Sequence, residues 1–266
     1  MAFFSIITIT FNSEKTIERT LKSVLAQTYT DYEYIVVDGA SKDSTMNIIR
    51  KYEPLFEGRM KWKSEPDTGI YNAMNKGIMR STGELIGIVN SDDWLELDAL
   101  ESIYECFKNN NSSLDKLYCG WIKFHYLSGK VQIMKTNHKI LEKLSGRYEM
   151  GGVRHPAVFV PNLVYQKYGV FDERMKIMAD ADLILRFYFA GIQFCYPEKV
   201  ISNMSDGGVS NSFNTRLYDD YKLILQKYKL SRLNLYRMLL FYGMKMIVKF
   251  LVPVKLISYY RSYSRT

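Results

Sequence analysis

Cysteine and histidine are scarce in this 266-residue chain, with three of each. Isolated cysteines without metal-ligand spacing predict free thiols in a reducing compartment, and they exclude a disulfide framework. The histidines are too scattered in the sequence to suggest a zinc cluster. The six residues are Cys106, Cys119, Cys195, His125, His138 and His155.

Long hydrophobic runs are also missing. The uncharged stretch Met238–Met244 is far shorter than the ~20 apolar residues that cross a bilayer. Met1 leads directly into Phe3–Thr10, without the basic segment and cleavage site of a secretory signal. The sequence therefore predicts a cytoplasmic protein.

Acidic residues are absent from the end of the chain. Residues 221–266 contain ten Lys and Arg and no Asp or Glu, whereas residues 1–220 hold 26 basic and 28 acidic residues. A basic tail on an acidic body does not favour nucleic-acid binding, for which the folded reading face is typically basic. Residues 230–266 mix basic, aliphatic and aromatic side chains, which predicts peripheral contact with the anionic inner face of a cell membrane. A helix packed on the body or on a second subunit is the alternative, and the oligomeric state stays open.

Strand-like and helix-like segments alternate through the first 115 residues. This alternation predicts an α/β fold with a mainly parallel sheet flanked by helices. The expected strands are Ser5–Thr10, Tyr34–Asp38, Met60–Lys63 and Glu84–Asn90. The expected helices contain Ile17–Leu25, Ile70–Met79 and Asp98–Phe107, and a further helix opens at Ser41–Ser44 and continues to Tyr52.

The second half of the chain has a different pattern. Leu117–Phe124 and Val131–Met134 flank a Ser128-Gly129 turn and predict a hairpin. Helices are expected at Asn162–Tyr168 and Asp180–Ala190, and strands at Gln193–Tyr196 and Val200–Met204. We interpret residues 1–115 as one half of a domain, 116–220 as its second half, and 221–266 as a basic amphipathic tail.

Carboxylates follow two of the expected strands. Asp38 ends one strand, and Asp92 and Asp93 follow another. Ligands bind at the carboxyl ends of strands in sheets of this kind. Adjacent carboxylates repel each other unless a cation is present, and Mg²⁺ or Mn²⁺ prefers oxygen ligands. Each acid has a structural alternative as a turn former or helix cap.

Further polar residues cluster at two expected helix starts. Asp67 precedes one helix, where N-capping is its structural alternative, and Lys76 lies about two and a half turns later. Asp180 and Asp182 stand at the start of another helix and do not share a face. Arg186 lies four residues after Asp182, a spacing that favours an ion pair.

Six segments in order resemble glycosyltransferase family 2. They are SIITITFN, VVDGASKD, SEPDTGIYNAMNKG, VNSDDW, FDER and ADADLILR, within Ser5–Ser210. The chain looks most similar to bacterial enzymes that build surface polysaccharides. The resemblance implies a GT-A fold and single-sugar transfer from a nucleotide-sugar, because the Gln/Arg-x-x-Arg-Trp motif of processive members is absent.

The resemblance implies roles for the donor-side residues. Asp38 would contact a uracil-like base, and Asp92 would help to hold the ribose and diphosphate. Asp93, with Asp92, would ligate Mg²⁺ or Mn²⁺, while Asp67 and Lys76 would line the donor pocket. The segment at Asp38 is DGAS where the family more often has DDGS, so one carboxylate stands in place of two.

The resemblance also implies roles on the acceptor side. Asp180 matches the base that takes a proton from an acceptor hydroxyl in an inverting displacement. Ala179 precedes it where many members have Glu, and Asp182 stays an alternative base. His155, Arg186 and the Gly207-Gly208 loop match segments near a glycan or polyprenyl-diphosphate-linked acceptor. A nucleotidyltransferase, or a carbohydrate-binding module without catalysis, is the alternative interpretation.

Overall fold

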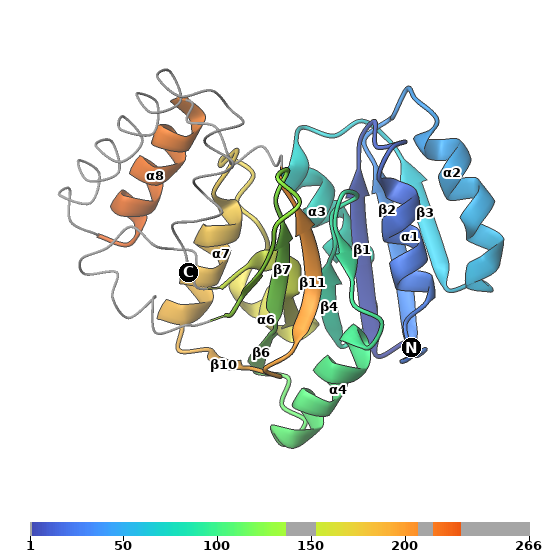
Figure 1. Ribbon diagram of the computed structural model, residues 1–266. Coiled ribbons are helices and arrows are strands. Elements are labelled where there is room, and N and C mark those ends of the chain that lie inside the picture. The colour runs from blue at the N-terminus through green and yellow to red at the C-terminus, as the bar shows by residue number, and fades with distance from the viewer. Residues whose placement is uncertain (1, 137–152, 207–214, 230–266) are drawn as a thin grey trace.

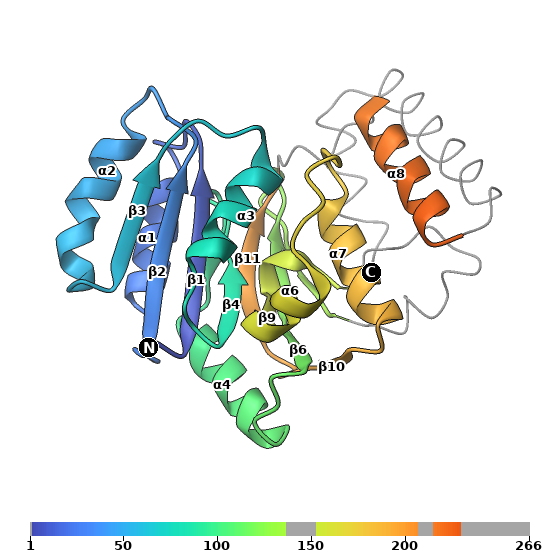
Figure 2. The same ribbon diagram turned by 180° about the vertical axis from the view of Figure 1, so that it is seen from behind.

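The computed structural model describes residues 2–136, 153–206 and 215–229 (Figures 1 and 2). Strands alternate with helices through the first part of the chain, as predicted. The strands are β1 (Phe4–Thr10), β2 (Tyr32–Asp38), β3 (Met60–Ser64) and β4 (Leu85–Ile88). The helices are α1 (Ile17–Leu25), α2 (Thr45–Tyr52), α3 (Ile70–Arg80) and α4 (Ala99–Asn109), with a 3-10 turn, η1, at Glu53–Phe56.

A seven-stranded sheet forms the centre of the molecule, in the order β10-β6-β9-β4-β1-β2-β3. Its remaining strands are β6 (Lys116–Cys119), β9 (Val158–Pro161) and β10 (Gln193–Cys195). Only β9 runs antiparallel to its neighbours among these strands. The predicted α/β class with a mixed, mainly parallel sheet is confirmed. Because β2 and β4 flank β1 on opposite sides, the strand order reverses at β1, where such sheets form ligand crevices.

Helices cover both faces of this sheet. On one face α3, α6 (Asn162–Tyr168) and α7 (Ala179–Phe189) share a core with the sheet, and α8 (Thr215–Lys227) lies outside α7 (Figure 2). On the other face lie α1, α2 and α4 (Figure 1). Burial on both sides explains why every residue of β1 and β2 is buried. The contact of α3 with β1 is close, since a Cβ on Gly77 would lie 2.5 Å from Cγ2 of Ile7.

A second sheet lies against the α4 side of the first. Its order is β5-β11-β7-β8, with β5 (Trp94–Leu95), β7 (Trp121–His125), β8 (Val131–Met134) and β11 (Val200–Ser205). The predicted hairpin is confirmed as β7 and β8. The single strand expected at Leu117–Phe124 is wrong, because the chain divides at Gly120 between the two sheets. A side chain at Gly120 would collide with Ile201 of β11, which allows the close crossing.

Other elements differ from the expectations. Ile70, the first residue of the helix expected at Ile70–Met79, is 43% exposed at the start of α3. Strands β5 and β9 and helix α8 were not predicted. Helix α8 runs across the expected boundary at residue 220, and its Tyr221 and Ile224 are buried in the core. No helix within the described ranges has the length and hydrophobicity needed to cross a membrane.

Candidate active site

The carboxyl ends of β1, β2, β3 and β4 meet at one edge of the large sheet (Figure 2). The chain after β1 and the chain after β4 are joined there, with the Ser13 and Ser91 hydroxyls 2.8 Å apart. Helices α3 and α7 also begin at this edge (Figure 2). The expected site residues Asp38, Asp92 and Asp180 are therefore brought to the same side of the molecule.

Asp38 ends β2 and is completely buried. Its Oδ2 accepts hydrogen bonds from the Ser41 amide at 3.0 Å and from the Ser64 hydroxyl at 2.6 Å. Its Oδ1 accepts a hydrogen bond from the Ser41 hydroxyl. The carboxylate therefore fixes the turn after β2 to the end of β3. These are the contacts of a turn former, which was the structural alternative for Asp38.

Phe11 and Asp67 border the turn after Asp38. A Cβ on Gly39 would lie 2.5 Å from Oδ2 of Asp67 and 3.3 Å from the Phe11 ring, so both side chains pack against bare backbone. The Phe11 ring is 60% exposed at the end of β1. Phe11 was not among the expected site residues, although an aromatic side chain at a carboxyl strand end was the available signal.

Asp67 and Lys76 both contact the loop between β3 and α3. Asp67 Oδ1 accepts a hydrogen bond from the Gly69 amide at 2.9 Å and closes the turn before α3, but Gly69 is the N-cap residue, so Asp67 does not have the capping role considered for it. The Lys76 ammonium donates to the Pro66 carbonyl at 2.8 Å and pairs with Glu65 at 3.3 Å. Lys76 thus stabilises the loop that presents Asp67.

Asp93 is 2% exposed, and its partner Asp92 is partly exposed. Burial, followed by the adjacent Asp92 charge, raises the pKa of the Asp93 carboxyl to about 7. The Asn90 Nδ2 group donates a hydrogen bond to Asp93 Oδ2 at 3.1 Å, and the Oδ1 atom of Asn90 is buried without a hydrogen-bond partner. A cation would favour the charged form of Asp93 and satisfy an orphaned oxygen.

These oxygen donors fit Mg²⁺ or Mn²⁺, which usually take only one or two carboxylates and complete their shell with phosphate oxygens and water. Among the described residues no group of three or more His, Cys, Asp or Glu could hold a metal ion. A metal ion bound here would therefore need ligands from the donor substrate in addition to Asp92 and Asp93.

Arg19 of α1 connects this acidic turn to the small sheet. Its guanidinium donates to the Asp92 carbonyl at 2.7 Å and to the Ser205 hydroxyl at 3.0 Å. It also lies 3.6 Å from the centre of the Trp94 ring. Sequence reasoning missed Arg19, because nothing in its own segment shows that α1 passes beside the acidic turn.

Asp180 is the second residue of α7. Burial raises the pKa of its carboxyl, and the Asp220 charge acts in the same direction, while hydrogen bonds from its own turn and from Tyr71 oppose them. Its Oδ1 accepts a hydrogen bond from the Ala181 amide at 2.8 Å. The residue is partly exposed and carries a carboxyl with raised proton affinity, which suits a general base.

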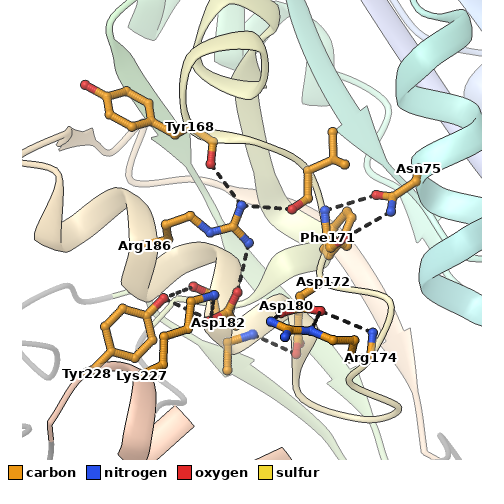
Figure 3. Close-up of polar contacts among 12 residues, drawn as sticks. Asn75, Tyr168, Phe171, Asp172, Arg174, Asp180, Asp182, Arg186, Lys227 and Tyr228 are labelled. Atoms are coloured by element: carbon orange, nitrogen blue, oxygen red, sulfur yellow. Dashed lines mark hydrogen bonds and ion pairs between the residues drawn. The ribbon is translucent and has the colours of Figure 1, made fainter. Parts of the chain in front are cut away.

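Asp182 has entirely different surroundings (Figure 3). It is fully buried and pairs with Arg186 at 2.8 Å and Lys227 at 2.7 Å. The Tyr228 hydroxyl donates to it at 2.9 Å, and Arg186 also donates to the carbonyls of Tyr168 and Val170 (Figure 3). The ion pair expected from the spacing is present; Asp182 joins α7 to α8, and Arg186 joins α7 to the end of α6.

His155 is buried in a short 3-10 turn, η4 (His155–Ala157), with its ring 5.2 Å from that of Phe171. Burial lowers its pKa to about 4, so the imidazole is neutral at physiological pH. Phe171 in turn stacks on Tyr71, which contacts Asp180. His155 thus packs against the aromatic residues next to Asp180. Gly207, Gly208 and the tail 230–266 lie outside the described residues.

Comparison with known proteins identifies similar chains. Residues 5–159 match the sequence family described as Glycosyl transferase family 2. A PGL/p-HBAD biosynthesis glycosyltransferase of Mycobacterium bovis (strain BCG / Pasteur 1173P2) is 28% identical over 218 residues, which cover 79% of each chain.

Solved structures share the fold. S. aureus TarS 1–349 in complex with UDP-GlcNAc has a TM-score of 0.66 at 20% identity, and the match covers 83% of this chain and 65% of that one. The corresponding match covers only 39% of a longer TarS chain. GalNAc-T7 with UDP, GalNAc and Mn²⁺ has a TM-score of 0.64 at 12% identity, covering 85% of this chain and 48% of that one. The predicted GT-A architecture is confirmed.

Proposed function

The chain belongs to glycosyl transferase family 2 and is a glycosyltransferase that uses a nucleotide-sugar, and we propose that it moves a single sugar from a UDP-sugar to an acceptor hydroxyl with inversion. The acceptor would be a glycan or a polyprenyl-diphosphate-linked glycan in bacterial polysaccharide biosynthesis. The related proteins support this choice, since one functions in PGL/p-HBAD biosynthesis and another binds UDP-GlcNAc.

The observation that carries the proposal is the environment of Asp180. The pKa of its carboxyl is raised. Asp180 lies in the first turn of α7, which starts at the same edge of the sheet as the chain that carries Asp92 and Asp93 after β4. By contrast, Asp182 is occupied by Arg186 and Lys227. The contacts thus favour Asp180 over Asp182 as the base.

The donor nucleotide would bind at the ends of β1, β2 and β3. The exposed Phe11 ring offers a stacking surface for a base, with the polar edge of Asp67 beside it. Asp38 is completely buried, and its carboxylate already accepts three hydrogen bonds from Ser41 and Ser64, so it presents no exposed oxygen to a ring N–H of the base. We therefore infer that Asp38 mainly shapes this pocket through the turn after β2.

The diphosphate would lie beside the acidic turn. Asp93 and Asp92, with the orphaned Asn90 Oδ1 nearby, would hold Mg²⁺ or Mn²⁺, and the Mn²⁺ in GalNAc-T7 supports this choice. When bound, such an ion supplies Lewis-acid stabilisation of negative charge on the phosphate oxygens. Arg19 holds the backbone carbonyl of Asp92 and so keeps the turn in place.

Transfer would proceed in one displacement. Asp180 accepts the proton of the acceptor hydroxyl, whose oxygen forms a bond to the anomeric carbon. The bond from that carbon to the diphosphate oxygen breaks on the opposite face, and the nucleoside diphosphate leaves with the bonding electrons. A base with raised proton affinity suits this step, because proton transfer is more favourable when the pKa lies closer to the working pH.

The proposed location of the protein follows from the proposed acceptor. A polyprenyl-linked acceptor would lie at the inner face of the cell membrane, where the basic residues of 230–266 would meet anionic lipid. We accordingly propose that the protein works in the cytoplasm as a peripheral membrane enzyme.

Substituting Asp180→Asn tests the mechanism. Transfer should fall by roughly 10²–10⁴-fold, because the amide cannot accept the proton, whereas donor affinity should stay within about twofold. Turnover would be followed as acceptor-dependent UDP release from a panel of UDP-sugars, with Mn²⁺ and simple alkyl glycosides as acceptors, and donor binding by calorimetry. Unimpaired turnover in a folded Asp180→Asn protein would refute the assignment of the base.

A further inference from the structure

Asp220 of α8 is a buried carboxylate without a role in the proposed reaction. It is 3% exposed and accepts hydrogen bonds from three consecutive backbone amides. Its Oδ2 lies 2.9 Å from the Lys176 amide, 2.6 Å from the Ile177 amide and 3.0 Å from the Met178 amide, and its Oδ1 lies 3.1 Å from the Lys176 amide. Successive amides converging on one carboxylate make a tight anion contact.

The amides that Asp220 binds belong to the backbone that enters α7. Met178 is the N-cap residue of this helix, and its side chain makes no capping hydrogen bond. Asp180 follows two residues later, in the first turn. A carboxylate from α8 thus supplies the hydrogen-bond acceptor that the Met178 side chain does not provide, and its negative charge also favours a helix N-terminus.

The other end of α8 and the residues after it also hold the first turn of α7. Lys227 pairs with Asp182 at 2.7 Å, and the Tyr228 hydroxyl donates to the Asp182 carbonyl at 3.0 Å (Figure 3). Between these two contacts, Tyr221 and Ile224 of α8 are buried in the core that α7 shares. Helix α8 therefore holds the segment that carries Asp180 at two points.

We propose that Asp220 is a positioning residue for the catalytic base: by binding the amides of 176–178 it fixes the direction in which Asp180 meets the acceptor hydroxyl. This inference rests on the proposed function, in which Asp180 is the base. Asp220 does not touch the substrates in this account and acts only through α7.

Asp220 also influences Asp180 through its charge. Its carboxylate raises the pKa of the Asp180 carboxyl, in the same direction as burial, whereas the Tyr71 hydroxyl from α3 opposes this effect. Removing the Asp220 charge should therefore lower the pKa of Asp180. A residue that only stabilised the fold would leave the pH dependence of turnover unchanged.

The variants Asp220→Asn and Asp220→Glu, with Asp219→Asn as a control, test this inference. Asp219 is the exposed neighbouring acid on the same helix, so its substitution removes an equal charge without touching α7. Acceptor-dependent UDP release from a panel of UDP-sugars, with Mn²⁺ and simple alkyl glycosides as acceptors, would be measured at donor saturation over a range of pH. Hydrogen–deuterium exchange would report on the amides of 176–178.

Asp220→Asn should lower kcat by about 10²-fold, the loss expected for a catalytic group misplaced by roughly 1 Å, with donor affinity unchanged. The acidic limb of the kcat profile should shift to lower pH, and exchange at 176–178 should accelerate. Asp220→Glu keeps the negative charge, so the acidic limb of its kcat profile should stay at the same pH. This variant decides the outcome if Asp220→Asn does not fold. Asp219→Asn should behave as the unchanged protein.

The positioning role would be overturned if folded Asp220→Asn had a normal kcat and an unshifted pH profile. If only Asp220→Glu folds, a normal kcat in that variant would overturn it. A lower melting temperature with normal kcat would likewise assign Asp220 to stability alone. Failure of the proposed function would look different: the unchanged protein would release no UDP, or Asp180→Asn would release it at the unchanged rate.

Discussion

At the scale of single residues, charge and burial separate two aspartates that the sequence places two positions apart. Asp182 faces Arg186 and Lys227 in the α7–α8 contact, and its charge is compensated. Asp180 points away from these cations, because two residues of a helix are about 200° apart, and desolvation raises its proton affinity. One residue therefore stabilises the structure, and the other is available for chemistry.

The acidic turn allows a prediction at the same scale. Asp93→Asn keeps the size of the side chain but removes its charge, so Mn²⁺ should bind at least about tenfold more weakly, as expected when an anionic ligand of a hard cation is lost. Titration of Mn²⁺ with and without UDP, followed by calorimetry, measures the effect. Asp31→Asn is a control, because Asp31 is exposed and precedes β2, at the opposite edge of the sheet from the acidic turn. Equal Mn²⁺ affinity in the unchanged protein and Asp93→Asn would contradict the metal assignment.

At the scale of elements, α7 and α8 act as a pair. The three groups around Asp182 come from both helices and from the residue after α8 (Figure 3). Asp182→Asn should destabilise the protein by about 3 kcal/mol, because the partly buried Arg186 would lose its counter-charge. Urea unfolding would measure this loss of stability.

Turnover of the same variant distinguishes the two acids. Well below its melting temperature, Asp182→Asn should keep kcat within about tenfold, since the base is intact. Lys227→Met is the matched control for stability. It removes a more exposed partner of Asp182, so it should lower the free energy of unfolding by no more than about 1 kcal/mol. If Asp182→Asn were as inactive as Asp180→Asn while still folded, Asp182 would regain its candidacy as the base.

At the scale of the whole molecule, the charge is divided between the body and the tail. Residues 230–266 hold seven Lys and Arg and no acid. The full chain should float with vesicles that contain anionic lipid and not with neutral vesicles, and 0.5 M salt should release it, because salt screens surface charge. A variant with these seven residues replaced by Gln should remain unbound. Equal recovery with anionic and neutral vesicles would exclude the membrane role.

The sequence alone determined most of the fold, because hydrophobic periodicity reports burial along a continuous segment. The helix at Asn162–Tyr168 was predicted with its exact bounds, and the strands at Tyr34–Asp38 and Met60–Lys63 to within two residues at either end. The acidic clusters could be placed at strand ends for the same reason. Periodicity does not reveal which sheet a short strand joins, so β5, β9 and the division at Gly120 were missed.

Only the tertiary structure decided which partners surround each expected site residue. Asp38 and Lys76 were expected to meet the donor, but their charges are directed at Ser41, Ser64 and Glu65. The roles of Arg19 and Asp220 could not be read from their own segments, because each acts on backbone about 40 or more residues away in sequence. Hydrogen bonds and charge interactions depend on distances in space, and folding brings together residues that the sequence keeps apart.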